Sequence, residues 1–341
     1  MSLGSGTWVG IARRHAHTIP GFETGKHAEW GAFPVSLAAL EERVPPMAGL
    51  AVAVLAVSTS AILVRWSSAP SVVKAFYRVV FTTALLLPWA LGRYRGDFRR
   101  MQLRDLGIAG LTGVALALHF AAWFESLNHT SVAASVTLVQ TQPLFVAVGA
   151  WALLEERLTR RMLAGIFVAL FGAAAMSLGD PLLALLGVGT ADALAGTGMF
   201  GNALALVGAV AAAAYVLAGR SLRQRVSLVP YVVVVYLACA AVLLAIAVAQ
   251  SAPLVDYPRR EWLLFLGMAL GPGIFGHTVI NWALAHVESG VVSVSLLGEP
   301  VGSTVLALLL LPGEIPTPTT IAGGAVVLLG IYITAAARDH D

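Results

Sequence analysis

The amino-acid sequence predicts an all-α membrane protein in which ten transmembrane helices form two inverted five-helix repeats. Three observations lead to this fold class. Hydrophobic residues make up 58% of the 341 residues and charged residues 11%, whereas a soluble domain carries about 25% charged residues. Ten apolar stretches have close to the roughly 20 residues that a membrane-spanning helix needs. A series of spaced residues also occurs twice, once in each half of the chain.

The first 45 residues precede the apolar stretches and are predicted to form a polar tail. No apolar segment follows Arg13 and Arg14, so the tail lacks the pattern of a secretory signal peptide. The predicted spans then follow in the order Met47–Trp66, Ser71–Tyr94, Leu106–Ser126, Ser131–Leu154, Arg161–Leu178, Gly201–Leu222, Leu228–Gln250, Glu261–His286, Gly290–Leu311 and Thr317–Ala336.

The two halves of the chain carry the same spaced residues in the same order. In the first half these are Gly113, His119, Pro143, Glu156, Thr159, Gly165 and Gly172. In the second half they return as Gly271, His277, Pro300, Glu314, Thr317, Gly323 and Gly330. The offset is 158 (271 − 113, for example) except at the proline, where it is 157. A duplicated membrane block of this kind is typical of secondary transporters.

These observations divide the chain into four expected parts. The segment Gly179–Phe200 contains several glycines together with Asp180, Pro181 and Asp192, and it joins the two halves. We therefore predict an N-terminal tail at 1–45, a first repeat at 46–179, a linker at 180–200 and a second repeat at 201–337.

The positive charges of the loops predict the orientation of the spans. If the N-terminus is cytoplasmic, the inside loops hold Arg93, Arg95, Arg99, Arg100, Arg104, Arg157, Arg160, Arg161, Arg220, Arg223 and Arg225. The outside loops then hold only Arg65, Lys74, Arg259 and Arg260. This bias predicts a multi-pass protein of the cytoplasmic (inner) membrane with both termini cytoplasmic. Because each half has five spans, the second half would be inserted upside down relative to the first.

Three segments resemble EamA-type proteins of the drug/metabolite transporter superfamily. They are AFYRVVFTTALLLP (75–88), TSVAASVTLVQTQPLFVAVGAWALLEERLT (130–159) and GHTVINWALAHVESGVVSVSLLGEPVGSTVLALLLLPGEIPTP (276–318). The resemblance covers residues 47–336 and leaves out the N-terminal tail. It implies ten helices in two inverted repeats around a central cavity, and the export or exchange of small metabolites.

Glu299 is the strongest candidate for a residue that binds the transported molecule. It lies near the middle of a predicted span, where a charge is costly, so it should face protein or water rather than lipid. Ser295 lies one turn earlier on the same helix face, and Pro300 removes a backbone N–H beside it. The alternative is a packing role, in which Glu299 pins neighbouring helices by hydrogen bonds. The first repeat has Gln142 at the corresponding position.

Other polar and aromatic residues within the spans could line the same cavity. His119 and His277 occupy equivalent positions in the two repeats, although a lone histidine in an apolar helix more often serves packing. Arg78 could attract an anionic group, pair with a carboxylate such as Glu299, or reach outward to solvent. The full set of predicted substrate-binding or cavity residues is Glu299, His277, His119, Gln142, Asn281, Trp282, Trp123, Ser295, Tyr215 and Arg78.

Prolines and glycines within the spans predict where the helices bend. Pro143 and Pro300 stand at matching places in the two repeats. Gly271, Pro272 and Gly273 loosen the eighth span shortly before His277. We expect a hinge or kink at each of these five residues.

The sequence predicts a transporter and not an enzyme. It has one cysteine, no HExxH pattern and no GxxxxGK[ST] pattern, so we expect no metal, no cofactor and no ATP hydrolysis by this chain. It also has no basic run with interleaved aromatic residues, so nucleic acid is not an expected partner.

We predict a secondary transporter, and specifically an exporter, that moves small metabolites by alternating access, with the substrate bound near the midplane between the repeats. Its partners would be the metabolite and the lipid bilayer. Protons are a candidate coupling ion, because burial favours the protonated form of a carboxyl group. An intramembrane enzyme or a non-transporting membrane assembly protein is the alternative.

Overall fold

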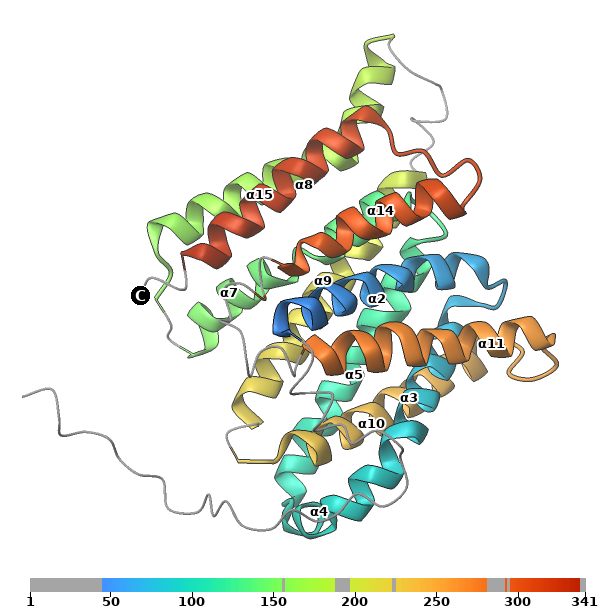
Figure 1. Ribbon diagram of the computed structural model, residues 1–341. Helices are drawn as coiled ribbons and strands as arrows, with labels where there is room; N and C mark the ends of the chain where they lie inside the picture. Colours follow the sequence, from blue (N-terminus) through green and yellow to red (C-terminus); the bar gives the residue numbers. More distant parts are fainter. Residues whose placement is uncertain are drawn as a thin grey trace, which may run out of the picture. The chain divides into compact units, whose positions relative to one another are not determined.

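The structure is a computed structural model that describes residues 45–154, 157–187, 197–222, 225–280, 292 and 295–337. Every regular element in this part of the chain is helical (Figure 1). The helices are α2 (Pro46–Trp66), α3 (Ser71–Arg93), α4 (Arg95–Arg100), α5 (Leu103–Ser126), α6 (Val132–Val139), α7 (Gln142–Leu154), α8 (Arg160–Leu185), α9 (Thr197–Leu222), α10 (Leu228–Ala249), α11 (Arg259–Met268), η2 (Ala269–Thr278), α14 (Gly298–Leu310) and α15 (Pro318–Ala336). Residues 1–44 of the predicted tail lie outside the described residues.

Eight helical stretches among the described residues are long and apolar enough to cross a membrane. They are α2, α3, α5, α6 with α7, α8, α9, α10 and α15. Helix α14 is apolar but has 13 residues, and α11 continues into η2, a π-helix of ten residues. The prediction of an all-α, multi-pass membrane protein is confirmed. The number of ten spans and their inverted arrangement stay predictions.

Helix α8 is longer than the sequence pattern indicated. The predicted fifth span ended at Leu178, before Asp180 and Pro181, but α8 runs to Leu185 and has 26 residues. A proline disfavours a helix interior because it lacks an N–H group. Here the carboxylate of Asp180 accepts hydrogen bonds from the hydroxyl groups of Thr317 (2.8 Å) and Thr319, at the start of α15. These bonds anchor this end of α8 and help to explain why the helix continues past the proline.

Helices α8 and α15 lie side by side (Figure 1) and touch backbone to backbone through glycines. A Cβ atom added to Gly165 would lie 2.7 Å from the carbonyl oxygen of Gly330. One added to Gly172 would lie 2.7 Å from the carbonyl oxygen of Gly323. The residue number therefore rises along α8 as it falls along α15, so the two helices are antiparallel. Small residues are what allow helices to approach this closely in a membrane.

The largest hydrophobic cluster joins α2, α3, α5, α10 and α11. Ile62, Phe124, Leu243 and Phe265 are almost fully buried in it. Tyr77 of α3 stacks on Phe265 of α11 with the ring centroids 5.0 Å apart. This cluster fixes the helices that carry most of the candidate residues of the first half.

Glu261, in the first turn of α11, should contribute measurably to stability. Its side chain is buried and accepts bonds from the Ser67 hydroxyl (2.5 Å), the Ser68 hydroxyl (3.0 Å) and the Ser68 N–H (3.0 Å). Replacing Glu261 by alanine would leave these donors unpaired, at a cost of about 1.5–3 kcal/mol. Thermal unfolding in detergent should show a lower midpoint temperature for the alanine variant, and Glu261→Gln should lower the midpoint less. An unchanged midpoint for the alanine variant would contradict this role.

Candidate functional site

The fourth predicted span consists of two helices with a break between them. Helix α6 ends at Val139 and α7 begins at Gln142, so Gln140 and Thr141 lie between them. Pro143 is the second residue of α7. A break in a membrane helix frees backbone groups for hydrogen bonding with side chains or a bound solute.

The ninth predicted span has a matching feature in the second half. Helix α14 begins at Gly298, after Leu297, so Glu299 is the second residue of the helix. Its carboxylate therefore lies in the first turn of α14, where the helix dipole favours a negative charge. Pro300 follows as the third residue, where its missing N–H costs little.

The two helix breaks meet through one short side-chain hydrogen bond. Nε2 of Gln140 donates to Oε2 of Glu299 over 2.6 Å. Helix α2 joins them, because the Ser58 hydroxyl lies 3.4 Å from the carbonyl oxygen of Glu299. The Ser303 hydroxyl in turn donates to the carbonyl oxygen of Ser58 over 3.1 Å. We call Ser58, Gln140, Glu299 and Ser303 the Glu299 cluster.

The match between the two repeats pairs Glu299 with Gln142, but the glutamine that contacts Glu299 is Gln140. The break after Val139 separates the two glutamines, so they no longer share one continuous helix. The sequence holds one signal of this break. The repeat offset changes from 158 at His119 to 157 at Pro143, so the first copy has one residue more between its histidine and its proline than the second copy has.

Arg78 lies buried inside the bundle and does not reach outward to solvent. It is 4% exposed, and its Nη1 donates to the Ser60 hydroxyl over 2.9 Å. Its guanidinium carbon lies 4.7 Å from the ring centre of Phe120 and 5.7 Å from that of Phe124. Such cation–π contacts stabilise a buried cation. Arg78 and Glu299, the buried cation and the candidate carboxylate, form no ion pair within 4.0 Å.

His119 and Trp123 form a stacked pair one turn apart on α5. The Nδ1 atom of His119 is 2.9 Å from the carbonyl oxygen of Gly208 on α9. The rings of His119 and Trp123 have centroids 5.8 Å apart and an angle of 25° between their planes. The indole N–H of Trp123 is buried and has no hydrogen-bond partner among the described residues. The His119 contact favours a packing role, whereas the unpaired indole N–H is a free donor.

The candidates of the second half are only partly described. Gly271, Pro272 and Gly273 lie within η2, so the expected loosening coincides with a π-helix. Ser295 is half-buried, and so is Tyr215, which packs against the largest cluster. The side chain of His277 and the whole of Asn281 and Trp282 lie outside the described residues.

An apolar groove of about 540 Å³ lies between α7, α8 and α9. Phe145, Leu170 and Met199 contribute to its lining, and Thr141 and Ser177 are its polar residues. This lining suits hydrocarbon chains better than a polar metabolite. Within the described part of the chain, no three His, Cys, Asp or Glu side chains are grouped to hold a metal ion.

Comparison with known proteins identifies one family and two similar transporters. The sequence model described as the EamA-like transporter family matches residues 45–178 and again residues 199–336. An uncharacterized transporter of Archaeoglobus fulgidus is 24% identical over 270 residues, which cover 78% of this chain and 88% of that protein. A second uncharacterized transporter of that organism is 30% identical over 237 residues, covering 68% of this chain and 76% of that protein.

A solved crystal structure also resembles this chain in fold. It has a TM-score of 0.57 at 23% sequence identity, over 87% of this chain and 98% of that one. At this identity the likeness concerns the fold alone.

Proposed function

The chain belongs to the EamA-like transporter family, and we propose that it is a secondary transporter that exports a small metabolite by alternating access. The substrate would bind near the membrane midplane, between the two halves of the chain. The observation that carries this proposal is the hydrogen bond between Gln140 and Glu299. It joins the breaks of two helices from different halves, which is where secondary transporters place their substrate sites.

The accessibility of these side chains supports the same site. Glu299 lies deep among the helices, yet it remains partly exposed, as do Gln140 and His119. Side chains that line an internal passage combine these two properties. Arg78 and Trp123 are buried, and we propose that they shape the site rather than close it.

An inverted repeat is part of the proposal. Gly165 and Gly323 are equivalent in the two copies, as are Gly172 and Gly330. The contacts run crosswise, from Gly165 to Gly330 and from Gly172 to Gly323. A twofold axis in the membrane plane brings equivalent helices together in this antiparallel, crosswise way. The halves could then rock against each other about α8 and α15.

We propose cytoplasmic termini and the cytoplasmic membrane as the location, on the charge bias of the loops. Proton coupling through Glu299 is a further part of the proposal, since it is a carboxyl group placed deep among the helices.

A ligand screen followed by a flux assay tests the proposed function. Purified protein is heated with each member of a library of small metabolites, and a binding metabolite should raise the unfolding temperature. Proteoliposomes should then take up that labelled metabolite faster than liposomes without protein. A metabolite that binds but is chemically converted, with no net flux, would favour an enzyme instead.

A further inference from the structure

Glu314 makes two short contacts with elements of the first half of the chain. Glu314 lies in the loop between α14 and α15, and its Oε2 is 2.6 Å from Nη2 of Arg65 at the end of α2. Its Oε1 accepts a 2.6 Å hydrogen bond from the N–H of Val132, the first residue of α6. The Glu314 side chain is 10% exposed. We call Arg65, Val132 and Glu314 the Glu314 latch.

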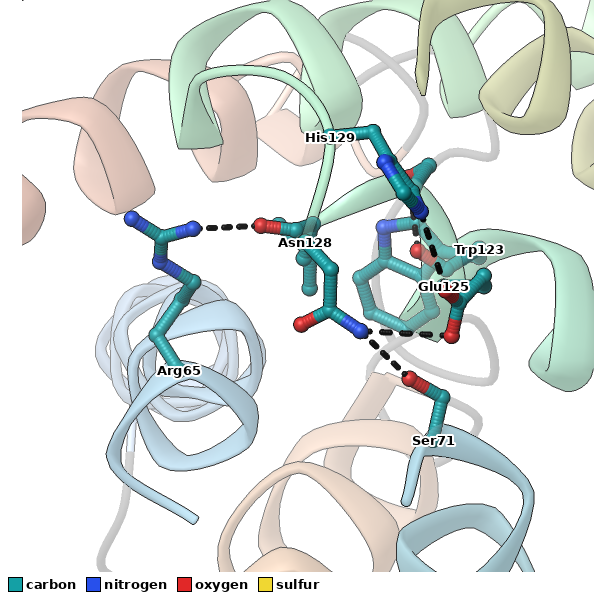
Figure 2. Close-up of polar contacts among 8 residues, drawn as sticks. Arg65, Ser71, Trp123, Glu125, Asn128 and His129 are labelled. Atoms are coloured by element: carbon teal, nitrogen blue, oxygen red, sulfur yellow. Dashed lines mark hydrogen bonds and ion pairs between the residues drawn. The ribbon is translucent and has the colours of Figure 1, made fainter. Parts of the chain in front are cut away.

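Each contact of the latch has a clear physical basis. The first N–H groups of a helix have no partner within the helix, so a carboxylate placed there both accepts a hydrogen bond and complements the helix dipole. The guanidinium of Arg65 adds a charge-assisted bond to the same carboxylate. Arg65 also donates from Nη1 to the carbonyl oxygen of Leu127 over 2.5 Å, at the corner between α5 and α6 (Figure 2).

The latch joins the two halves of the chain, unlike the other carboxylate at this corner. Arg65 and Val132 belong to the first half and Glu314 to the second. Glu125 instead bonds to Asn128 (3.2 Å) and His129 (3.0 Å), both in the first half (Figure 2). Glu125 therefore holds the corner together internally, and its removal should leave the contact between the halves intact.

Four side chains at the corner between α5 and α6, where the latch attaches, have no access to solvent. Leu127, Val132, Ser126 and Ser135 are all 0% exposed. Ser135 lies about one helical turn inside Val132, and its hydroxyl is 2.6 Å from that of Ser126. Every side chain of α6, from Val132 to Val139, is buried among the described residues, so α6 is closed to solvent between the latch and Gln140 in this conformation.

We propose that the Glu314 latch is a gate, and that this face opens when Glu314 leaves Arg65 and the start of α6. The inference rests on the proposed function, because only a transporter needs this face to open. To the proposed function the inference adds the residues that keep one end of the substrate path closed. The energy that favours the closed face would come mainly from the two bonds to Glu314, so loss of either partner should raise the open population.

A single reporter cysteine measures this opening without a substrate. In full-length protein with Cys239→Ala, the only native cysteine is removed, and Ser135→Cys places a thiol beneath the latch. A charged, water-soluble maleimide is added to the protein in nanodiscs, so both faces are accessible. We expect slow labelling in this parent protein. Labelling should be about tenfold faster with Glu314→Gln or Arg65→Gln, since a charge-assisted hydrogen bond shifts an equilibrium by at least that factor.

Two further variants separate gating from general loosening of the fold. Glu125→Gln is the matched control and should label at the parent rate. The double charge reversal, Arg65→Glu with Glu314→Arg, should label more slowly than either single reversal. Equal rates in the parent, Glu314→Gln and Arg65→Gln would overturn the gate, and so would equal acceleration by Glu125→Gln. Labelling can also be faster in Glu314→Gln and Arg65→Gln while the parent protein shows no flux of any metabolite. That result would contradict the proposed function, but it would still show that the contacts of Glu314 hold this face closed.

Discussion

Replacement of Gly330 by leucine is expected to destroy the stable fold. A Cβ atom at this position would lie 2.6 Å from the carbonyl oxygen of Gly165 and 2.7 Å from the Cβ of Ala169, so α15 would have to move away from α8. The obstacle is largely backbone, which cannot rotate aside as a side chain can. The cost should reach or exceed about 3 kcal/mol, a large share of the ~5–15 kcal/mol that stabilises a typical folded protein.

Size-exclusion chromatography and thermal unfolding in detergent measure the effect of Gly330→Leu. We expect little monodisperse protein and a strongly lowered unfolding temperature. Gly107→Leu is a matched control in an apolar helix, because a Cβ atom there meets nothing within 4 Å. A Gly330→Leu variant as stable as Gly107→Leu would show that the close contact of α8 and α15 is not required.

Replacement of Glu299 by glutamine should reduce transport at least tenfold while the protein stays folded. The substitution preserves the shape of the side chain but removes the ionisable group that faces Gln140. A binding group that a substrate or proton must engage cannot be replaced by a neutral isostere without loss. The rate should be measured in proteoliposomes with the metabolite found by the ligand screen.

Two measurements accompany the Glu299→Gln result. Thermal unfolding should show that the variant remains folded, because the Ser58 hydroxyl still meets the backbone carbonyl of residue 299. Glu125→Gln, which changes a carboxylate near one face, should transport at nearly the wild-type rate. Wild-type flux in Glu299→Gln at several pH values would remove Glu299 from the substrate site and from proton coupling.

The sequence predicted the membrane class well because the bilayer imposes a simple rule. A spanning helix must be apolar over about 20 residues and must satisfy its own backbone groups. Leu228–Ala249 and Pro46–Trp66 obey this rule, and the observed helices closely match the predicted spans. The glycine offset also singled out Gly165 and Gly330, which do lie at a close helix contact.

The contacts within the candidate site could not be predicted to the same degree. Gln140 meets Glu299 only because α6 stops at Val139, and local sequence gave little sign of that stop. The surroundings of Arg78 depend on rings that α5 places beside α3, so they follow from tertiary packing. Helix periodicity describes one helix face, whereas a site between halves depends on which faces meet.

Counterflow is the most direct test of alternating access around the Glu299 cluster. Proteoliposomes are loaded with an excess of the unlabelled metabolite, and a trace of the labelled form is added outside. If one site is exposed to each side in turn, label should accumulate inside transiently above its outside concentration, and Glu299→Gln should lose this overshoot. Label that only equilibrates, without an overshoot in the wild-type protein, would contradict alternating access.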